Sequence, residues 1–345
     1  MRKLASIKKI DKLEPIKGAD KIELATVGGW KVVVSKDVGH QEGDMVVYCE
    51  IDSFLPIEPE FEFLRKSSYK KMVDGTEGFR LRTRKLRNQI SQGLILPLQD
   101  AINVMKRKNG EVYHEMLEEG KEVTELLGIT KWEPPVPANL AGTAKGNFPS
   151  FLQKTNEERV QNLTQEYEQW KSENHNFYVT EKLDGSSATF YYRDGEFGVC
   201  SRNLELIENE NNTFWKVVKE LKLEEKLKFY GKNISLQGEL IGEGIQKNRY
   251  KIKGQTVRFF NVFDIDNYKK VDFDTFHQVI QDLDLQTVPI TAAPGFKLPS
   301  TVGDLLTMAE SKSVMNDKTE REGVVIRSKD NKISFKVISN KFLLK

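Results

Sequence analysis

The sequence predicts an α+β protein of two domains, in which a small β-barrel domain precedes a domain of mixed strands and helices. Within the first ~100 residues, short apolar runs are separated by glycine and proline, which is typical of an all-β domain. A stretch rich in proline and glycine follows at 132–149, and strands mix with helices beyond it. At 345 residues the chain is long enough for two cores. We therefore predict a barrel domain at 1–130, a linker at 131–150 and an α+β domain at 151–345.

The first domain contains strand-length apolar runs, namely Leu24 to Val27, Trp30 to Val34, Met45 to Ile51 and Leu94 to Leu98. The segments 19–24 and 41–48 resemble parts of the small OB-fold barrels that bind nucleic acids. Residues from about 101 to 130 are predicted to form helix and turn. This resemblance implies that the first domain grips a polynucleotide.

Two helices are predicted in the second domain. The sequence Thr-Asn-Glu-Glu at 155–158 is a capping box, which predicts a helix from about 156 to 172. Residues 212–229 have an amphipathic pattern, and Trp215, Val218 and Leu221 are expected to pack in the core rather than to form a binding stripe.

Composition excludes several classes of protein. Cys49 and Cys200 are the only cysteines, so a disulfide framework and a cysteine metal site are not expected, and with only four scattered histidines no zinc site is expected. No apolar stretch approaches the length of a membrane span, and the N-terminus lacks an apolar signal segment. We therefore expect an intracellular, cytoplasmic protein without membrane contact. A net charge of +2 does not by itself indicate nucleic-acid binding.

The strongest functional signal is an ordered set of four motifs. Glu-Lys-Leu-Asp-Gly-Ser at 181–186 places Lys182 at a turn between predicted strands. Gln-Gly-Glu-Leu at 237–240, Glu-Gly-Val-Val-Ile-Arg at 322–327 and Phe335-Lys336 follow in that order. The set combines a cleft lysine with two glutamates and a second basic residue, which suits attack by an amine on a nucleotide phosphate.

Each residue type has a physical role in that chemistry. A lysine amine is nucleophilic only when neutral, so its pKa of about 10.4 must fall, and desolvation and nearby positive charge both act in that direction. Lys336, Arg202 and a bound metal ion are the candidate sources of charge. Magnesium usually takes one or two protein carboxylates together with phosphate and water oxygens, a demand that Glu239 and Glu322 fit.

Each motif also has an ordinary structural interpretation. Asp-Gly after a strand is the common hairpin signal. A glutamate beside an apolar run is commonly a solvated strand end, and a lone lysine in an alternating strand commonly faces solvent. The joint order of the four motifs favours nucleotidyl transfer over these separate explanations.

The set resembles the covalent nucleotidyltransferase superfamily of DNA ligases, RNA ligases and messenger-RNA capping enzymes. The resemblance implies an ATP-grasp-like ligase adenylylation domain in which Lys182 forms a lysyl-nucleotide phosphoramide. It also implies that Glu181 contacts the adenine edge, Arg202 a phosphate or sugar, and Glu239 the ribose. The stretch 258–264, Arg-Phe-Phe-Asn-Val-Phe-Asp, resembles the segment whose aromatic residue stacks on the base.

Further roles are implied near the C-terminus. Glu322 matches the metal-binding glutamate and Lys336 the first lysine of the last motif. Many RNA ligases carry Lys-x-Lys there, whereas this chain has Ile338 at the second position, so either Lys336 acts alone or Lys341 reaches in. Phe260 and Phe263 are both candidates for base stacking, and core packing is the alternative for each.

Two groups of residues are predicted to contact nucleic acid. The stretch from Arg65 to Arg87 contains nine basic residues, and its only acidic residues are Asp74 and Glu77. Of the basic residues, we expect Arg82, Arg84 and Arg87 to contact the phosphate backbone. A solvated strand face is the alternative. Arg159 and Asn162 lie in a segment that resembles the one before the lysine motif in one RNA ligase subfamily, and a solvated helix face is their alternative.

The order of domains resembles the nick-sealing RNA ligases of the Deinococcus and Naegleria type. DNA ligases and capping enzymes carry an OB domain after the last motif, whereas here nine residues follow Lys336 and the OB-like segment comes first. This resemblance implies an ATP-dependent RNA ligase that uses Mg²⁺ or Mn²⁺ and joins 3′-hydroxyl and 5′-phosphate ends at nicks in RNA-containing duplexes. No obligate protein partner is evident. A DNA ligase, a guanylyltransferase or an inactive nucleic-acid-binding homologue are the alternatives.

Overall fold

The computed structural model describes residues 3–344 except 73, 112–116 and 134–142. The chain divides into two compact units, Met1–Pro135 and Val136–Leu343, and this division falls inside the predicted linker. Each unit has its own hydrophobic core. Among the described residues, no helix is long and apolar enough to cross a membrane.

The first unit consists mainly of short strands. They are β1 (Ala5–Lys9), β2 (Lys12–Pro15), β3 (Ile22–Val27), β4 (Trp30–Ser35), β5 (Met45–Cys49), β6 (Ser53–Pro56), β7 (Tyr69–Lys71), β8 (Glu77–Arg80), β9 (Arg84–Leu86), β10 (Gln89–Ser91), β11 (Leu94–Pro97) and β12 (Thr130–Lys131). Within the part of this unit that the structure describes, they pair in four sheets, β1-β5-β11, β2-β3-β4, β12-β6-β8-β7 and β9-β10, rather than in one closed barrel. The predicted apolar runs supply β3, β4, β5 and β11.

Short helices complete this unit. They are η1 (Lys36–Val38), η2 (Pro59–Leu64), α1 (Arg65–Ser68) and α2 (Leu98–Asn109). Helix α2 buries Ala101, Val104 and Met105 against the core of Ile7, Val47 and other strand residues. The helix expected from about 101 thus begins three residues earlier, directly after Pro97.

The described residues of the second unit form two sheets. The seven-stranded sheet has the order β13-β18-β17-β16-β19-β20-β21, and the five-stranded sheet the order β14-β24-β23-β15-β22. Their strands are β13 (Ala144–Asn147), β14 (Glu158–Arg159), β15 (Phe177–Lys182), β16 (Ser186–Arg193), β17 (Glu196–Cys200), β18 (Leu204–Leu206), β19 (Ile234–Gly242), β20 (Gln255–Asp264), β21 (Lys269–Lys270), β22 (Ile290–Phe296), β23 (Gly323–Ser328) and β24 (Ser334–Ile338).

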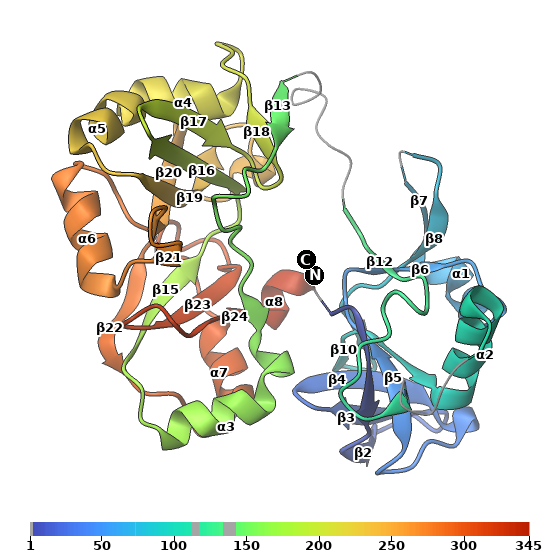
Figure 1. Cartoon of the computed structure of the whole chain (residues 1–345). Coiled ribbons are helices and arrows are strands. Elements are labelled where there is room, and N and C mark those ends of the chain that lie inside the picture. The colour runs from blue at the N-terminus through green and yellow to red at the C-terminus, as the bar shows by residue number, and fades with distance from the viewer. Residues whose placement is uncertain (1–2, 73, 112–116, 134–142, 345) are drawn as a thin grey trace. The chain divides into compact units, whose positions relative to one another are not determined.

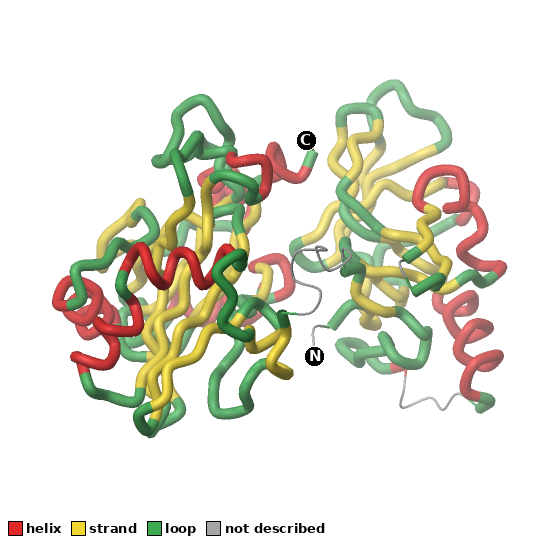
Figure 2. The backbone as a smooth tube through the Cα atoms, turned by 90° about the horizontal axis from the view of Figure 1, so that it is seen from above, coloured by secondary structure: helices red, strands yellow, loops and turns green. Residues whose placement is uncertain are grey.

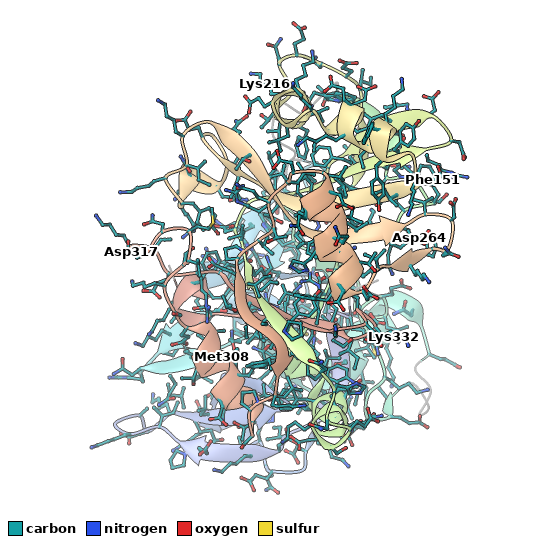
Figure 3. The ribbon with its side chains drawn as sticks, turned by 90° about the vertical axis from the view of Figure 1, so that its left-hand side faces the viewer. Phe151, Lys216, Asp264, Met308, Asp317 and Lys332 are labelled. Atoms are coloured by element: carbon teal, nitrogen blue, oxygen red, sulfur yellow. The ribbon has the colours of Figure 1, made fainter. Side chains whose placement is uncertain are left out.

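Helices connect and flank the strands of this unit. They are η5 (Val160–Asn162), α3 (Thr164–Ser172), α4 (Thr213–Leu221), α5 (Leu223–Tyr230), η6 (Gln246–Asn248), α6 (Phe273–Asp282), α7 (Val302–Ala309) and α8 (Asn340–Leu343). Figure 1 shows α4 and α5 along the seven-stranded sheet and α3 and α7 beside the five-stranded one, and Figure 2 shows helices flanking the strands. In Figure 3, α4, marked by Lys216, and α7, marked by Met308, lie at opposite ends of the unit.

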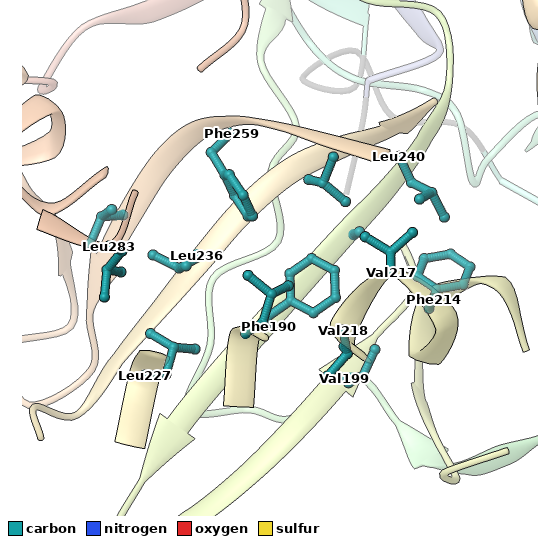
Figure 4. Close-up of a cluster of buried hydrophobic side chains, with 14 of the residues drawn as sticks. Phe190, Val199, Phe214, Val217, Val218, Leu227, Leu236, Leu240, Phe259 and Leu283 are labelled. Carbon is teal, nitrogen blue, oxygen red and sulfur yellow. The ribbon is translucent and has the colours of Figure 1, made fainter. Parts of the chain in front are cut away.

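Each sheet buries an apolar face. Phe190, Leu236 and Phe259 of the seven-stranded sheet pack against Phe214 and Val217 of α4, as Figure 4 shows. On the five-stranded sheet, one face of β15, β23 and β24 packs against Tyr167 of α3 and Leu305 of α7. Because side chains alternate along a strand, the other face of the five-stranded sheet carries the residues between these core positions.

Two predicted helices differ from the structure. The capping box at 155–158 does not start a helix: Glu158 and Arg159 form β14, paired in parallel with β24, and α3 begins only at Thr164. The prediction failed because sheet pairing competes with local capping. The helix expected at 212–229 is two helices, α4 and α5, separated at Lys222, whose φ of 53° is left-handed.

Candidate active site

Lys182 ends β15, and its ammonium lies between strands that approach very closely. In the sheet Lys182 pairs with Gly323, the residue after Glu322, and Lys182 Nζ lies 2.7 Å from Glu322 Oε2. A Cβ on Gly323 would come within 2.1 Å of the Val337 carbonyl oxygen, and one on Gly185 within 2.4 Å of the Leu240 carbonyl oxygen. Both glycines are therefore needed for the close approach of the strands that carry the site residues.

Glu239 comes to the same place from the other sheet. It lies on β19 opposite Ser187 of β16, and its Oε1 accepts a hydrogen bond of 3.1 Å from the Gly185 amide. Burial, together with the carboxylate of Glu322, raises the pKa of Glu239 to about 8, although Lys182 acts in the opposite direction. The turn at 184–186 thus connects the lysine strand to the strand that faces Glu239.

The pKa of Lys182 is raised, contrary to the lowered pKa expected from the sequence. Burial alone would lower it, but the carboxylates of Glu322 and Glu239 outweigh burial and stabilise the ammonium form. The protein's own charges around Lys182 are therefore predominantly negative. A cation that neutralises these carboxylates would lower the pKa of Lys182 and so favour its uncharged amine.

The carboxylate pair fits a divalent cation that shares its coordination with phosphate. Among the described residues, no cluster of three or more His, Cys, Asp or Glu side chains could hold a metal ion by itself. Glu239 and Glu322 supply the one or two carboxylates that Mg²⁺ usually takes from a protein, and the remaining ligands would be phosphate and water oxygens.

Lys336 lies on the same side of the five-stranded sheet as Lys182. It pairs with Val325 of β23, which in turn pairs with Thr180 of β15, and Thr180 is two residues before Lys182. Residues two apart on a strand share a face, so both lysines project from one surface. Ile338 pairs with Gly323 and is buried. Lys341 lies 3.6 Å from Glu310 Oε2, so its ammonium is paired with that carboxylate.

Glu181 projects from the face opposite Lys182. Ser313 Oγ donates to its Oε1 at 2.5 Å, and the Val314 amide donates to its Oε2 at 2.7 Å. Burial raises its pKa, although these two hydrogen bonds lower it in part. The structure thus uses the Glu181 carboxylate to hold the segment at 313–314.

The two candidate stacking residues occupy different environments. Between β19 and β20 the register shifts, so that Gln237 pairs with Asn261 and Gly238 with Phe259, which leaves Phe260 as the extra residue of a bulge. Phe260 is half-buried, packs against the cluster that contains Leu183, and has the Arg327 guanidinium carbon 5.6 Å from its ring centroid. Phe263 is fully buried in a core cluster with Tyr191.

The remaining candidates near the site differ in exposure. Arg202 is exposed in the bend after β17. Arg159 is 5% exposed and lies in register with Lys336. Asn162 Nδ2 donates to Glu158 Oε1 at 3.0 Å. Because Arg159 is buried beside Lys336, it does not lie on a solvated helix face, which was the alternative interpretation.

Sequence reasoning missed two ion pairs. Arg327, 2% exposed, lies 3.1 Å through Nη2 from Glu157 Oε1. Arg249 Nε lies 2.6 Å from Asp184 Oδ2, beside the lysine turn. An arginine at the end of the apolar run 323–326 was the available signal for the first pair, because arginine is rarely buried unless it is paired. The second pair joins distant segments and had no local signal.

The basic residues of the first unit are partly engaged within it. Arg84 donates to the Ser67 carbonyl, Arg80 lies 3.4 Å from Asp52, and Arg65 pairs with Glu62 at 2.6 Å. Arg82 and Arg87 are exposed. Arg87 and Asn88 both have positive φ and form the two-residue turn between β9 and β10.

Comparisons with known proteins follow the two-unit organisation. A family model described as RNA ligase matches residues 175–341, and a model described as an OB-fold domain matches residues 4–98. These matches confirm the predicted fold class. A comparison with curated protein sequences finds no match.

Solved structures match the whole chain. It is 40% identical to a mutant of Naegleria gruberi RNA ligase in its apo form, with a TM-score of 0.90 and coverage of 99% of this chain and 97% of that one. A second mutant of that ligase, with AMP and Mn, also has 40% identity and a TM-score of 0.90, and a third, with ATP and Mn, has 40% identity and a TM-score of 0.89. Both matches cover 99% of this chain and 98% of the other.

Proposed function

The chain belongs to the RNA ligase family, and on that premise we propose that it is an ATP-dependent enzyme that joins the 3′-hydroxyl and 5′-phosphate ends of RNA. The observation that carries this proposal is the position of Lys182, whose Nζ lies 2.7 Å from Glu322 with Glu239 on the facing sheet. Relatives solved with ATP and Mn, and with AMP and Mn, support ATP and a divalent cation as the cofactors.

The first step follows from the residues at the site. The uncharged Lys182 amine attacks the α-phosphorus of ATP, and a P–N bond forms as the bond from the α-phosphorus to the oxygen that bridges the α- and β-phosphates breaks. Pyrophosphate leaves, and the nitrogen releases one proton to solvent. A divalent cation held by Glu322 and Glu239 would neutralise their charge, which favours the uncharged amine, and would stabilise charge on the phosphate. Lys336, on the same face, would also neutralise the transferring phosphate.

Two further steps complete joining. The AMP moves from Lys182 to a 5′-phosphate end, and a 3′-hydroxyl then attacks that activated phosphate and expels AMP. Phe260 is the proposed base-stacking residue, because it is half-buried beside the Lys182 strand whereas Phe263 lies in a core cluster. Arg202 is proposed to contact phosphate or sugar.

We propose that the substrate is a nick in an RNA-containing duplex, which the first unit grips. The OB-fold match to residues 4–98 and the exposed Arg82 and Arg87 support this role. Dependence on ATP and the buried free thiols of Cys49 and Cys200 support an intracellular location. The presence of Lys182, Glu239, Glu322 and Lys336 together favours a working enzyme over a binding homologue.

Labelling with ATP tests this function. Incubation with α-labelled ATP and Mg²⁺ or Mn²⁺, followed by denaturation, should leave label on the protein, and Lys182→Ala should abolish it while circular dichroism stays unchanged. Replacing labelled ATP with labelled GTP tests whether the protein is a guanylyltransferase. Replacing the RNA 3′-end of the substrate with a DNA 3′-end tests whether it is a DNA ligase. Protein that was isolated with AMP already attached would not label, so the protein is first treated with pyrophosphate to remove that AMP. If the treated protein, freed of pyrophosphate, still forms no labelled adduct, the proposal is contradicted.

A further inference from the structure

A buried layer of charge lies on the Lys182 face of the five-stranded sheet. Arg327, on β23, lies 3.1 Å through Nη2 from Glu157 Oε1, and its Nη1 donates to Thr180 Oγ1 at 3.2 Å. Thr180 is two residues before Lys182 and shares its face. Arg327 therefore fixes the strand that carries the nucleophile.

Glu157 connects the same layer to the strand of Lys336. Its Oε1 also accepts a hydrogen bond of 3.2 Å from Ser334 Oγ, and Ser334 is two residues before Lys336 on β24. Lys270 Nζ lies 4.0 Å from the same carboxylate oxygen. Burial raises the pKa of Glu157, but the charges of Arg327 and Lys270, a backbone hydrogen bond and the charge of Lys336 outweigh burial and bring this pKa to about 2. Glu157 thus lies within ion-pair distance of two cations, Arg327 and Lys270.

Arg327 of this pair also lies beside Phe260, the proposed base-stacking residue. The Arg327 guanidinium carbon is 5.6 Å from the Phe260 ring centroid, within the range of a cation–π contact. Phe260 belongs to a bulge of the other sheet, where the paired ladder does not constrain it. A guanidinium fixed by Glu157 and Thr180 supplies the constraint that the ladder does not.

From these contacts we infer that the Glu157–Arg327 pair positions the nucleotide site, with Arg327 setting the plane of Phe260 and Glu157 holding Arg327 and, through Ser334, the strand that carries Lys336. This inference rests on the proposed function, because it assigns a role in ATP use. Neither residue is given a chemical step: each acts through the side chain that it holds. A buried pair that served only the fold would be replaceable by apolar side chains.

The test uses the full chain and compares charge removal with fold stability. The double variant Glu157→Met, Arg327→Met removes both charges of the pair together, while Lys270, whose side chain is 19% exposed, keeps access to solvent. It is therefore expected to keep a melting temperature within a few degrees of wild type. We expect its half-saturating ATP concentration for Lys182 adenylylation to rise at least about tenfold, with a smaller fall in the rate at saturating ATP. Wild-type values of both in a folded double variant would overturn the inference.

A second variant applies if the double variant does not fold. Arg327→Lys keeps the positive charge beside Glu157 but loses the planar fork that reaches Thr180 and faces Phe260. We expect the same rise in half-saturating ATP, and an unchanged value would contradict the inference. The matched control is Asp274→Asn, Lys329→Met, which removes a solvent-exposed pair separated by 2.8 Å in the same unit and should change neither quantity.

The two hypotheses fail in different ways. If wild-type protein forms no adduct with ATP, the proposed function fails. If wild-type protein labels, and the folded Glu157 and Arg327 variants label with the same ATP dependence, only the positioning role fails.

Discussion

Lys182 Nζ and Glu322 Oε2 lie 2.7 Å apart, because the lysine ends β15 directly opposite Gly323, the first residue of β23. One sheet register therefore sets the distance between the nucleophile and a candidate metal ligand. Anything that shifts β23 relative to β15 or β24 should change catalysis without removing a reacting group.

Substitution of Gly323 tests this dependence on register. In Gly323→Ala the new Cβ would lie 2.1 Å from the Val337 carbonyl oxygen, so β23 and β24 must separate. We expect a destabilisation of about 1–3 kcal/mol and a fall of at least about tenfold in the adenylylation rate. Thermal melting and labelling with ATP measure the two effects. Gly146→Ala, where a Cβ meets nothing within 4 Å, is the control and should leave both values at wild type.

The two phenylalanines should separate binding from stability. Phe260→Ala removes the proposed stacking ring at a half-buried bulge, so we expect weaker ATP use, roughly 1–3 kcal/mol in apparent affinity if stacking resembles that of bases on aromatic side chains. Phe263→Ala empties a fully buried site and should cost about 3–5 kcal/mol of unfolding free energy. ATP titration of adenylylation and urea unfolding distinguish them. Equal losses of ATP affinity in both variants would argue against Phe260 as the stacking residue.

The basic side chains of the first unit should not be equivalent. Arg82 and Arg87 are exposed, whereas Arg84 is engaged with the Ser67 carbonyl. We expect Arg82→Ala and Arg87→Ala each to reduce the slope of log binding constant against log salt by about 0.9 on nicked duplex. Arg84→Ala should mainly lower thermal stability. Binding measured from about 50 to 200 mM salt tests this prediction. An unchanged slope in the Arg82, Arg87 double variant would indicate that these residues form an ordinary solvated surface and do not contact phosphate.

Stability should fall at acid pH through Glu157. Its folded pKa of about 2 lies below the ordinary value of 4.5, so its contribution is complete above pH 4.5 and disappears as pH falls towards 2. The contribution is about 3 kcal/mol at neutral pH. Urea unfolding of wild type and Glu157→Gln should therefore differ most near pH 7 and converge towards pH 2. A constant difference between the two proteins from pH 7 to pH 3 would contradict this account.

The order of the four motifs was sufficient to predict the chemistry, because each motif lies at or beside a strand whose apolar pattern is local. Lys182 ends a strand-length apolar run, β19 with Glu239 is nearly buried throughout, and Lys336 alternates with Phe335 and Val337 in a period-two pattern, all of which are local features of the sequence. The all-β character of the first unit was predictable for the same reason.

Tertiary structure decided what depends on pairing between distant segments. The bulge that separates Phe260 from its neighbours arises from the register of β19 on β20, which no local pattern specifies. The capping box at 155–158 was overridden because β14 pairs with β24, about 180 residues later, and this pairing brings Glu157 to Arg327. Likewise, the raised pKa of Lys182 reflects the carboxylates of Glu322 and Glu239, which come from distant segments of the chain. The sequence by itself determined which chemical groups are present and the strands that carry them. Only the three-dimensional pairing of strands determined which of these groups lie together in the buried site. The reason is that electrostatic energies depend on distance and burial rather than on separation along the chain.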